Sequence, residues 1–372
     1  MTMETMLLKP EEKSVFALRA LYEKYGYTQF KMSKFEEYDL YVRNKDFLVS
    51  DNIITFTDTN GKLMALKPDV TLSIIKNTKD EETRKLYYTE NVYRVSKSTQ
   101  SFKEIMQVGL ECVGRVDDYC LFEVLMLAAE SLSVISDDFV LDISHMAILS
   151  EMIKSLDLSG DVEKEILKCM GEKNAHQIRK ICKENNCDEE KSNRLCELAS
   201  VYGTSKEVIE KIKSITGDCA KEAVCQLETL VNLLEETGYG SKIHIDFSVV
   251  NDMGYYNGIV FRGFINNIPE GILSGGQYDK LMKKMNKKSK AVGFAVYPDS
   301  LSRLTEACAE FDIDTVILYD ENTDIKKLAE FVRMMTVSGK SVTAQKEIPQ
   351  RLKYRQLLKM NEKGVEILES HA

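Results

Sequence analysis

The chain has 372 residues, of which 44% are hydrophobic and 29% are charged, and its formal net charge is −9. A chain of this length and composition is typical of a soluble globular protein with two or three domains. The negative net charge argues against general binding to nucleic acid, which requires a strongly basic face.

The nine cysteines are an odd number, and no two of them are spaced as Cys-x-x-Cys. This usage predicts free thiols in a reducing compartment and argues against a disulfide framework or a zinc site. The N-terminus has no long apolar segment, and no apolar run reaches the ~18 residues that a membrane span requires. We therefore expect a cytoplasmic protein with no membrane segment and no bound metal.

The N-terminal region predicts a helix followed by a hairpin. Apolar residues recur at helical spacing from residue 10 onward, and Gly26 ends the helix. Residues 53–58 and 62–66 are separated by Asn-Gly, the favoured pair for a tight hairpin turn. A second helix opens directly afterwards, where Asp69 and Thr71 are natural capping residues. The alternative interpretation is that Asp69 points into a binding site.

Residues 87–114 contain two strand-like runs joined by a polar segment, which predicts an antiparallel hairpin. The first run carries Arg94, and the second carries Gln107 and Glu111. These groups suit a small zwitterion, because a carboxylate can bind a cation and a guanidinium can bind an anion. Strands with one Arg and one Glu also occur on solvated faces, so the pattern alone leaves both interpretations open.

In the remainder of the chain, the spacing of apolar residues distinguishes helical segments from strands. Residues 117–132 are apolar almost all round and predict a buried helix, and residues 139–143 predict a short strand. From about residue 157 to 237 the charge is high and amphipathic helices follow one another without strand signals. We expect an all-helical insertion there, within a mixed domain over residues 1–311. Residues 312–372 predict a small C-terminal α/β module with the order β-α-β.

A strand is predicted over residues 255–264, and it begins with Tyr255 and Tyr256. Alternation along a strand predicts that only one of these rings faces a site, and the spacing favours Tyr256. The Gly275-Gly276 pair predicts a tight backbone passage beside a ligand, because the P-loop signature does not follow it.

Several motifs occur in one order along the chain. They are PDVT at residues 68–71, the hairpin with MQVGLE at 106–111, GYYNGIVF at 254–261, GGQYDKL at 275–281 and AVGFA at 291–295. This order resembles the catalytic core of histidyl-tRNA synthetase over roughly residues 10–310. The resemblance implies an α+β fold of the class II aminoacyl-tRNA synthetase type, with an antiparallel sheet core and a helical insertion.

The departures from the synthetase pattern fall mostly on the side that would bind ATP. Asn251 stands where the synthetases carry an Arg beside the α-phosphate, and a neutral amide cannot offset the charge that develops as pyrophosphate leaves. Lys97 lies where an acidic residue helps to hold ATP, and Gln277 replaces the Arg of the GRYD motif. Arg303 falls about one helical turn after the position of the late ATP-binding Arg. Ser33 replaces the Pro of the first dimer motif.

The residues on the amino-acid side are those that the resemblance implies for histidine binding. Asp69 and Thr71 can bind the ammonium group, Glu111 can accept an imidazole N–H, and a tyrosine hydroxyl can hold the other ring nitrogen. Arg94 is the natural partner of the ligand carboxylate. The full predicted set is Asp69, Thr71, Arg94, Gln107, Glu111, Tyr255, Tyr256 and Tyr278.

A chain that keeps a histidine pocket and loses adenylation chemistry is similar to the ATP phosphoribosyltransferase regulatory subunits, a family of histidyl-tRNA synthetase paralogues. The resemblance implies a non-catalytic protein without a cofactor, which partners the short-form catalytic subunit in the first step of histidine biosynthesis. It implies feedback inhibition by histidine, and a homodimer within a hetero-octamer. No tRNA binding is expected, because the C-terminal module is too short for an anticodon-binding domain.

Two other functions are compatible with the sequence. The chain could be a divergent histidyl-tRNA synthetase in which Lys97 or Arg303 replaces the lost cation. It could also be a synthetase-like module that binds a partner and no ligand. A structural role for Glu111 is a further alternative, in which this carboxylate is buried and paired with Arg94.

Overall fold

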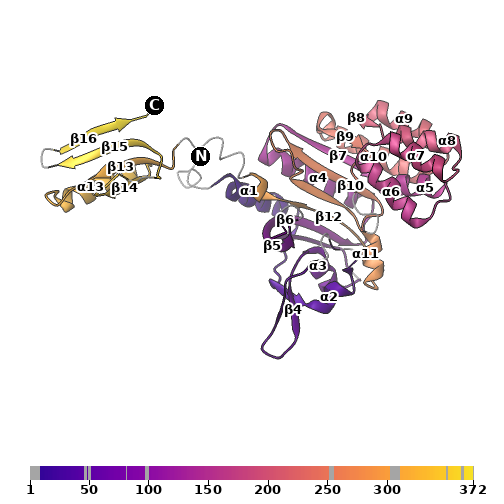
Figure 1. Cartoon of the computed structure of the whole chain (residues 1–372), viewed down its shortest axis with the longest axis horizontal. Coiled ribbons are helices and arrows are strands. Elements are labelled where there is room, and N and C mark those ends of the chain that lie inside the picture. Colours follow the sequence, from indigo (N-terminus) through magenta and orange to yellow (C-terminus); the bar gives the residue numbers. More distant parts are fainter. Residues whose placement is uncertain are drawn as a thin grey trace. The chain divides into compact units, whose positions relative to one another are not determined.

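The computed structural model describes residues 9–45, 48, 52–80, 82–96, 100–250, 255–301, 311–348, 351–361 and 364–371. The chain forms two compact units (Figure 1). One is Glu11–Leu301, and the other combines Ser302–Ala372 with Met1–Pro10. The division falls at Leu301, whereas the sequence placed it at residue 311, and the segment 302–310 between these positions lies outside the described residues.

The larger unit is built on a nine-stranded sheet with the order β1-β5-β6-β12-β11-β10-β7-β9-β8. Neighbouring strands from β5 to β7 are all antiparallel, and β1 and β9 add to this core in parallel. The predicted α+β fold with an antiparallel core is therefore confirmed. In sheet order the strands are Thr28–Gln29, Arg84–Val95, Phe102–Gly114, Lys290–Val296, Leu273–Gln277, Ile259–Ile265, Phe139–His145, Ile243–Asp246 and Tyr202–Gly203.

Helices α1 (Pro10–Lys24) and α4 (Asp118–Ile135) cover one face of this sheet. The Tyr22 ring of α1 packs edge-on against Phe294 of β12, and its hydroxyl lies 3.0 Å from Ser131 Oγ of α4. Leu132 of α4 reaches β10, where a β-carbon added to Gly263 would lie 2.7 Å from the leucine side chain. The helix that was predicted to be apolar all round is thus buried against the sheet.

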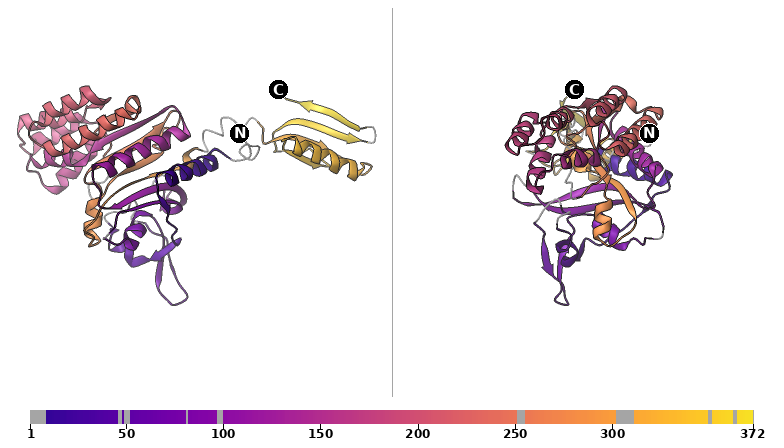
Figure 2. Two further views of the ribbon diagram at one scale, coloured as in Figure 1. Left: turned by 180° about the vertical axis from the view of Figure 1, so that it is seen from behind. Right: turned by 90° about the vertical axis from the view of Figure 1, so that its right-hand side faces the viewer.

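Smaller elements lie over the opposite face. They include α3, the short helix α11 and a three-stranded sheet with the order β2-β4-β3, which projects from the core in Figures 1 and 2. Gly61, with φ of +80°, makes the turn between β3 and β4 where Asn-Gly was predicted. The bounds are Thr71–Asn77 for α3, Asp279–Lys284 for α11, Phe35–Glu37 for β2, Tyr38–Val42 for α2, Thr55–Thr57 for β3 and Leu63–Leu66 for β4.

Six helices gather at the β7-β9-β8 end of the sheet (Figure 1), and the last five of them, α6 to α10, fall within the insertion predicted over about residues 157–237. One expectation was wrong, because the insertion also contains the short strand β8, which pairs with the edge of β9. Two residues are too few to leave a periodic signal in the sequence. The helices are Met146–Lys154 (α5), Gly160–Gly171 (α6), Ala175–Glu184 (α7), Glu189–Leu198 (α8), Ser205–Thr216 (α9) and Lys221–Glu236 (α10), followed by the 3-10 turn Gly240–Lys242 (η3).

The smaller unit is a four-stranded sheet with the order β14-β13-β15-β16 and helix α13 on one face. Ile317, Leu328 and Leu358 belong to the core between helix and sheet. The predicted β-α-β order is confirmed, and the weaker tail that follows it is a hairpin of β15 and β16. The elements are Ile313–Leu318 (β13), Ile325–Val337 (α13), Val342–Gln345 (β14), Tyr354–Asn361 (β15) and Gly364–Ser370 (β16).

Candidate ligand-binding site

A cavity of about 680 Å³ lies on the sheet face that α1 and α4 leave uncovered. On β6, Gln107 and Glu111 line this cavity, whereas Leu110 points to the helical face and is fully buried. All the residues that were predicted from the sequence to bind histidine line the same cavity, although they come from five separate stretches of the chain. They are Asp69, Thr71, Arg94, Gln107, Glu111, Tyr255, Tyr256 and Tyr278.

Glu111 is the most deeply placed carboxylate of the cavity and is only 2% exposed. Thr71 Oγ1 donates a hydrogen bond to one of its oxygens at 2.9 Å, and the Tyr278 hydroxyl donates to the other at 2.5 Å. Burial raises the pKa of Glu111 to about 8, against the lowering effect of these two hydrogen bonds. At neutral pH the carboxyl group is therefore largely protonated, and a cationic or N–H-donating ligand would favour its ionised form.

Asp69 has both of the roles that the sequence left open. One oxygen accepts a hydrogen bond from the Leu72 amide at 2.9 Å in the first turn of α3, and the other lies 3.9 Å from an Arg94 guanidinium nitrogen. Burial raises the pKa of Asp69, and Arg94 partly offsets this effect. Arg94 Nε also donates to the Pro68 carbonyl at 2.7 Å. The alternative pairing of Glu111 with Arg94 is wrong, because the ion pair of Arg94 is with Asp69.

Three tyrosine rings form one wall of the cavity. The ring centroids of Tyr255 and Tyr256 are 4.6 Å apart, and those of Tyr255 and Tyr278 are 5.7 Å apart. The expectation that only one of the first two faces the site was wrong, because β10 begins at Ile259 and neither tyrosine lies on a strand. A β-carbon at Gly276 would lie 2.6 Å from the Tyr256 ring, so this glycine allows the ring to approach the sheet closely.

The cavity also has lining residues that the sequence analysis did not propose. Tyr88 belongs to β5, Arg262 to β10, and Ser274 and Tyr297 meet through their hydroxyl oxygens at 3.1 Å. Arg262 is the single charged residue in the otherwise apolar strand IVFRGFI, which is a signal only once the cavity beside that strand is known. The contact of Ser274 with Tyr297 joins two distant segments and leaves no local signal.

Most of the positions that distinguish the chain from a synthetase lie outside the described residues. Asn251, Lys97 and Arg303 belong to this group. Gln277 is described, and its amide nitrogen donates to Asp279 at 2.7 Å. Asp279 also accepts a hydrogen bond from the Ala291 amide of β12 at 3.1 Å, so Gln277 has a structural partner where the synthetase motif has an Arg.

Neither a metal site nor a membrane-spanning helix occurs in the part of the chain that the structure describes. In that part no group of three or more His, Cys, Asp or Glu side chains could hold a metal ion. No helix in the described ranges is long and apolar enough to cross a membrane.

The antiparallel core, the helical insertion and the polar cavity define a protein of the class II synthetase-like type. The family model described as histidyl-tRNA synthetase matches residues 7–301. The ATP phosphoribosyltransferase regulatory subunit of Caldanaerobacter subterraneus subsp. tengcongensis is 32% identical over 286 residues, which cover 75% of this chain and 74% of the relative. The chain belongs to the histidyl-tRNA synthetase family and, within it, to the ATP phosphoribosyltransferase regulatory subunits.

Two solved structures show the same fold. An ATP phosphoribosyltransferase regulatory subunit/histidyl-tRNA synthetase from Bacillus halodurans aligns with a TM-score of 0.71 and 23% identity, over 90% of this chain and 88% of that chain. A chain of the ATP phosphoribosyl transferase (HisG:HisZ) complex from Thermotoga maritima aligns with a TM-score of 0.62 and 21% identity, over 77% and 97% of the two chains. The family resemblance predicted from the order of the motifs is confirmed.

Proposed function

We propose that this chain is the regulatory subunit of ATP phosphoribosyltransferase and that its cavity senses histidine. The chain takes part in the first step of histidine biosynthesis by controlling a catalytic partner, and it does not catalyse the step itself. The name shared by its relatives supports the regulatory role. The single observation that supports histidine as the ligand is Glu111, a buried carboxyl group held by Thr71 and Tyr278 inside a polar cavity.

The chemistry of histidine suits the groups that line the cavity. Its imidazole N–H can donate to Glu111, which becomes ionised when it gains such a partner. Its ammonium group can approach Asp69, whose charged partner, Arg94, lies at the long distance of 3.9 Å. The tyrosine rings offer apolar faces to the imidazole and hydroxyl groups to its second nitrogen.

The partner and the assembly belong to the same proposal. The partner is the short-form catalytic subunit of ATP phosphoribosyltransferase, and the regulatory chains form a dimer within a hetero-octamer in the cytoplasm. Histidine inhibits the catalytic subunit by binding to this chain, and no tRNA is bound. A coupling between two such sites is ordinarily worth ~1–3 kcal/mol, which corresponds to a change in affinity of about 5- to 150-fold.

Isothermal titration calorimetry of histidine into the purified chain tests the ligand. We expect saturable binding, and no heat at millimolar histidine would contradict the proposal. The regulatory role is tested by mixing the chain with a short-form catalytic subunit and measuring its rate with and without histidine. We expect the rate to fall as histidine saturates the cavity.

The second candidate function is a divergent synthetase, and a pyrophosphate-exchange assay with ATP and histidine distinguishes it. Exchange requires a cation that stabilises the departing pyrophosphate, and Asn251 cannot supply one. We expect no exchange that depends on histidine. Clear exchange would assign the chain to the synthetases.

A further inference from the structure

The cavity contains a second arginine with no role in the function proposed above. Arg262 lies on β10 and lines the same cavity as Glu111. We propose that Arg262 is the anion-binding residue of the cavity and that it holds the carboxylate of the amino-acid ligand, the role that was predicted for Arg94. This inference rests on the proposed function, because it concerns the orientation of histidine in that cavity.

Arg94 is less suited to the role because its Nε–H and its charge already have partners within the protein. Its Nε donates to the Pro68 carbonyl at 2.7 Å, and its charge faces Asp69 at 3.9 Å. A carboxylate that bound Arg94 would compete with Asp69 for the same charge. Arg94 therefore orients Asp69, and a different cation is needed for the negative end of a zwitterion.

Arg262 is available and is also held in place. Its side chain is exposed, and it forms no hydrogen bond or ion pair with the residues that the structure describes. Its guanidinium carbon lies 5.3 Å from the centre of the Phe264 ring, which provides a cation–π contact. A β-carbon at Gly271 would overlap Arg262 Nε, so the absence of a side chain there makes room for the arginine.

The sheet register places Arg262 at a suitable distance from Glu111. Three strand spacings separate β6 from β10. Across β12 and β11, Glu111 of β6 lies opposite Gly293, which lies opposite Gly276. Gly276 in turn lies opposite Val260 of β10. Arg262 lies two residues beyond Val260 on the same face, so the two Cα atoms are roughly 16 Å apart. A histidine with a hydrogen bond at each end extends over roughly 12 Å. The inclined side chains of Glu111 and Arg262 can cover the rest of the distance between their Cα atoms.

The charges of the cavity support the same assignment. Asp69 and Arg94 compensate each other, and Glu111 is largely neutral at pH 7. The acidic neighbour of Arg262 is Asp142, directly opposite on β7, whose own pKa is raised to about 7 by burial and by Asp246. Asp142 is therefore a partial counter-ion, and the carboxylate of the ligand completes the neutralisation of Arg262. Ser274 lies directly opposite Arg262 on the neighbouring strand β11, and its hydroxyl group meets that of Tyr297, which follows β12, so this pair of hydroxyl groups can donate to the same carboxylate.

The test compares histidine with histamine, which lacks the carboxylate, by calorimetry on the full chain. We expect Arg262→Ala to weaken histidine binding by about 10- to 100-fold, as is usual for a hydrogen bond between charged groups, and to leave histamine binding unchanged. Arg262→Lys should recover part of the loss because it keeps the charge. Arg84→Ala is the matched control, since Arg84 is an exposed arginine of the same sheet outside the cavity, and it should bind histidine normally.

Equal affinities of the wild-type chain and Arg262→Ala for histidine would overturn the inference and leave the proposed function intact. A loss of histidine binding that histamine shares and that Arg262→Lys does not recover would also overturn it, because Arg262 would then support the fold of the cavity. A wild-type chain that binds no histidine would overturn both the proposed function and the inference.

Discussion

Glu111 is a carboxyl group whose surroundings hold it largely in the neutral form at neutral pH. It is buried, it accepts hydrogen bonds from two hydroxyl groups, and its opposite neighbour on β12 is Gly293. Ionisation of a carboxyl group in such a position costs free energy, because the charge is removed from water. A hydrogen-bond donor in the site can compensate this cost. We therefore expect the protonation of this one residue to affect both the proposed binding of histidine and the stability of the ligand-free chain.

We expect Glu111→Gln to keep the fold and to weaken histidine binding by at least about tenfold, because an amide cannot become the charged partner of an imidazole. Calorimetry measures the affinity, and circular dichroism measures the melting temperature. Glu104→Gln is the matched control on the same strand, since Glu104 is exposed and bonds Asn91 and Tyr93 outside the cavity. Early melting or precipitation of Glu111→Gln would show that the residue serves the fold.

The raised pKa of Glu111 predicts how the stability of the ligand-free chain depends on pH. The folded pKa of about 8 lies above the value of 4.5 for an unperturbed Glu, so folding favours the protonated form. This contribution to the free energy of unfolding is fully present below pH 4.5 and is lost as the pH rises through 8. In urea denaturation series, the free energy of unfolding of the wild-type chain should fall relative to that of Glu111→Gln as the pH rises from 4.5 to 8. A difference that does not change with pH would contradict the assignment.

At the scale of elements, the floor of the cavity depends on glycines in neighbouring strands. A β-carbon at Gly293 would overlap the Glu111 carboxylate, and one at Gly276 would lie 2.6 Å from the Tyr256 ring. Close packing leaves no room for an added methyl group at either position. The two strands therefore have no side chain at the points where Glu111 and Tyr256 approach the backbone.

We expect Gly293→Ala to lower the free energy of unfolding by about 1–3 kcal/mol, the usual cost of overpacking, and to reduce histidine binding because Glu111 is displaced. Urea denaturation and calorimetry measure the two effects. Gly160→Ala is the control, because nothing lies within 4 Å of a β-carbon at that position in α6. Unchanged stability of Gly293→Ala would mean that the strands can separate to accept the methyl group.

Elements with a strong local pattern were predictable from the sequence, and the contacts between them were less so. The hairpin of β5 and β6 was predicted from its alternation, and α4 from its apolar circumference. The start of β10 was misplaced by four residues, because tyrosines fit a strand pattern even where they lie in a loop. Arg262 was missed because one charge in an apolar strand is informative only when the cavity beside it is known.

The prediction of the site residues rested mainly on the order of the motifs along the chain. Local pattern alone left Asp69 with two interpretations, and the structure shows that it serves α3 and the cavity together. The partners of Arg94 could not be predicted, because Asp69 lies 25 residues away in the sequence and adjacent only in space. The segments around Asn251 and Arg303 fall outside the described residues, so the expectations about them remain predictions.

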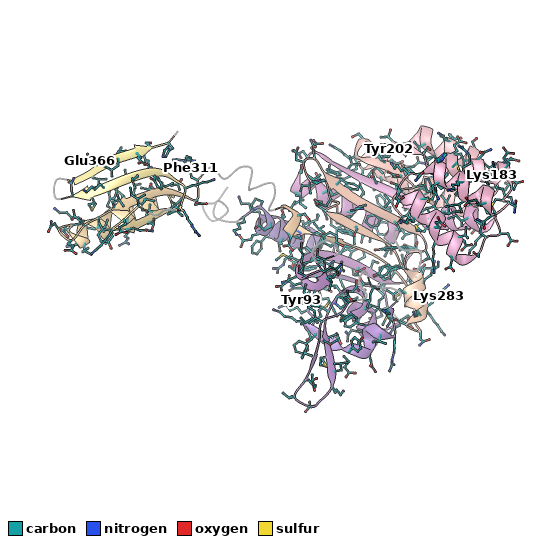
Figure 3. The ribbon with its side chains drawn as sticks, viewed as in Figure 1. Tyr93, Lys183, Tyr202, Lys283, Phe311 and Glu366 are labelled. Atoms are coloured by element: carbon teal, nitrogen blue, oxygen red, sulfur yellow. The ribbon has the colours of Figure 1, made fainter. Side chains whose placement is uncertain are left out.

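At the scale of the whole molecule, polar contacts join the helical insertion to the sheet within the larger unit. Lys173, in the turn between α6 and α7, donates to Asp246 of β9 at 2.7 Å and lies 4.6 Å from the centre of the Tyr202 ring. The Tyr202 hydroxyl lies 2.7 Å from His244 Nδ1, and Figure 3 shows Tyr202 beside the helices. The insertion is therefore fixed to β9 by a charged pair and an aromatic contact.

We expect Lys173→Ala to destabilise this junction by about 1–2 kcal/mol, because it leaves the buried Asp246 without its cationic partner. Hydrogen exchange measured by mass spectrometry should become faster in β8 and β9 and stay unchanged in the hairpin of β5 and β6. Lys168→Ala is the control, since its ion pair with Glu172 is exposed and 4.0 Å long. Equal exchange in both variants would show that the junction does not depend on the pair.

The short strand β8 has a further consequence for the solubility of the chain. It covers the outer edge of β9 by pairing Tyr202 with Asp246 and Gly203 with Ile245. An uncovered edge strand is a template on which other chains can add strands and aggregate. A shortened chain from which the insertion is removed would expose the backbone of Ile243–Asp246 to other copies of itself. The insertion thus protects the sheet edge from aggregation, whatever part it also takes in regulation.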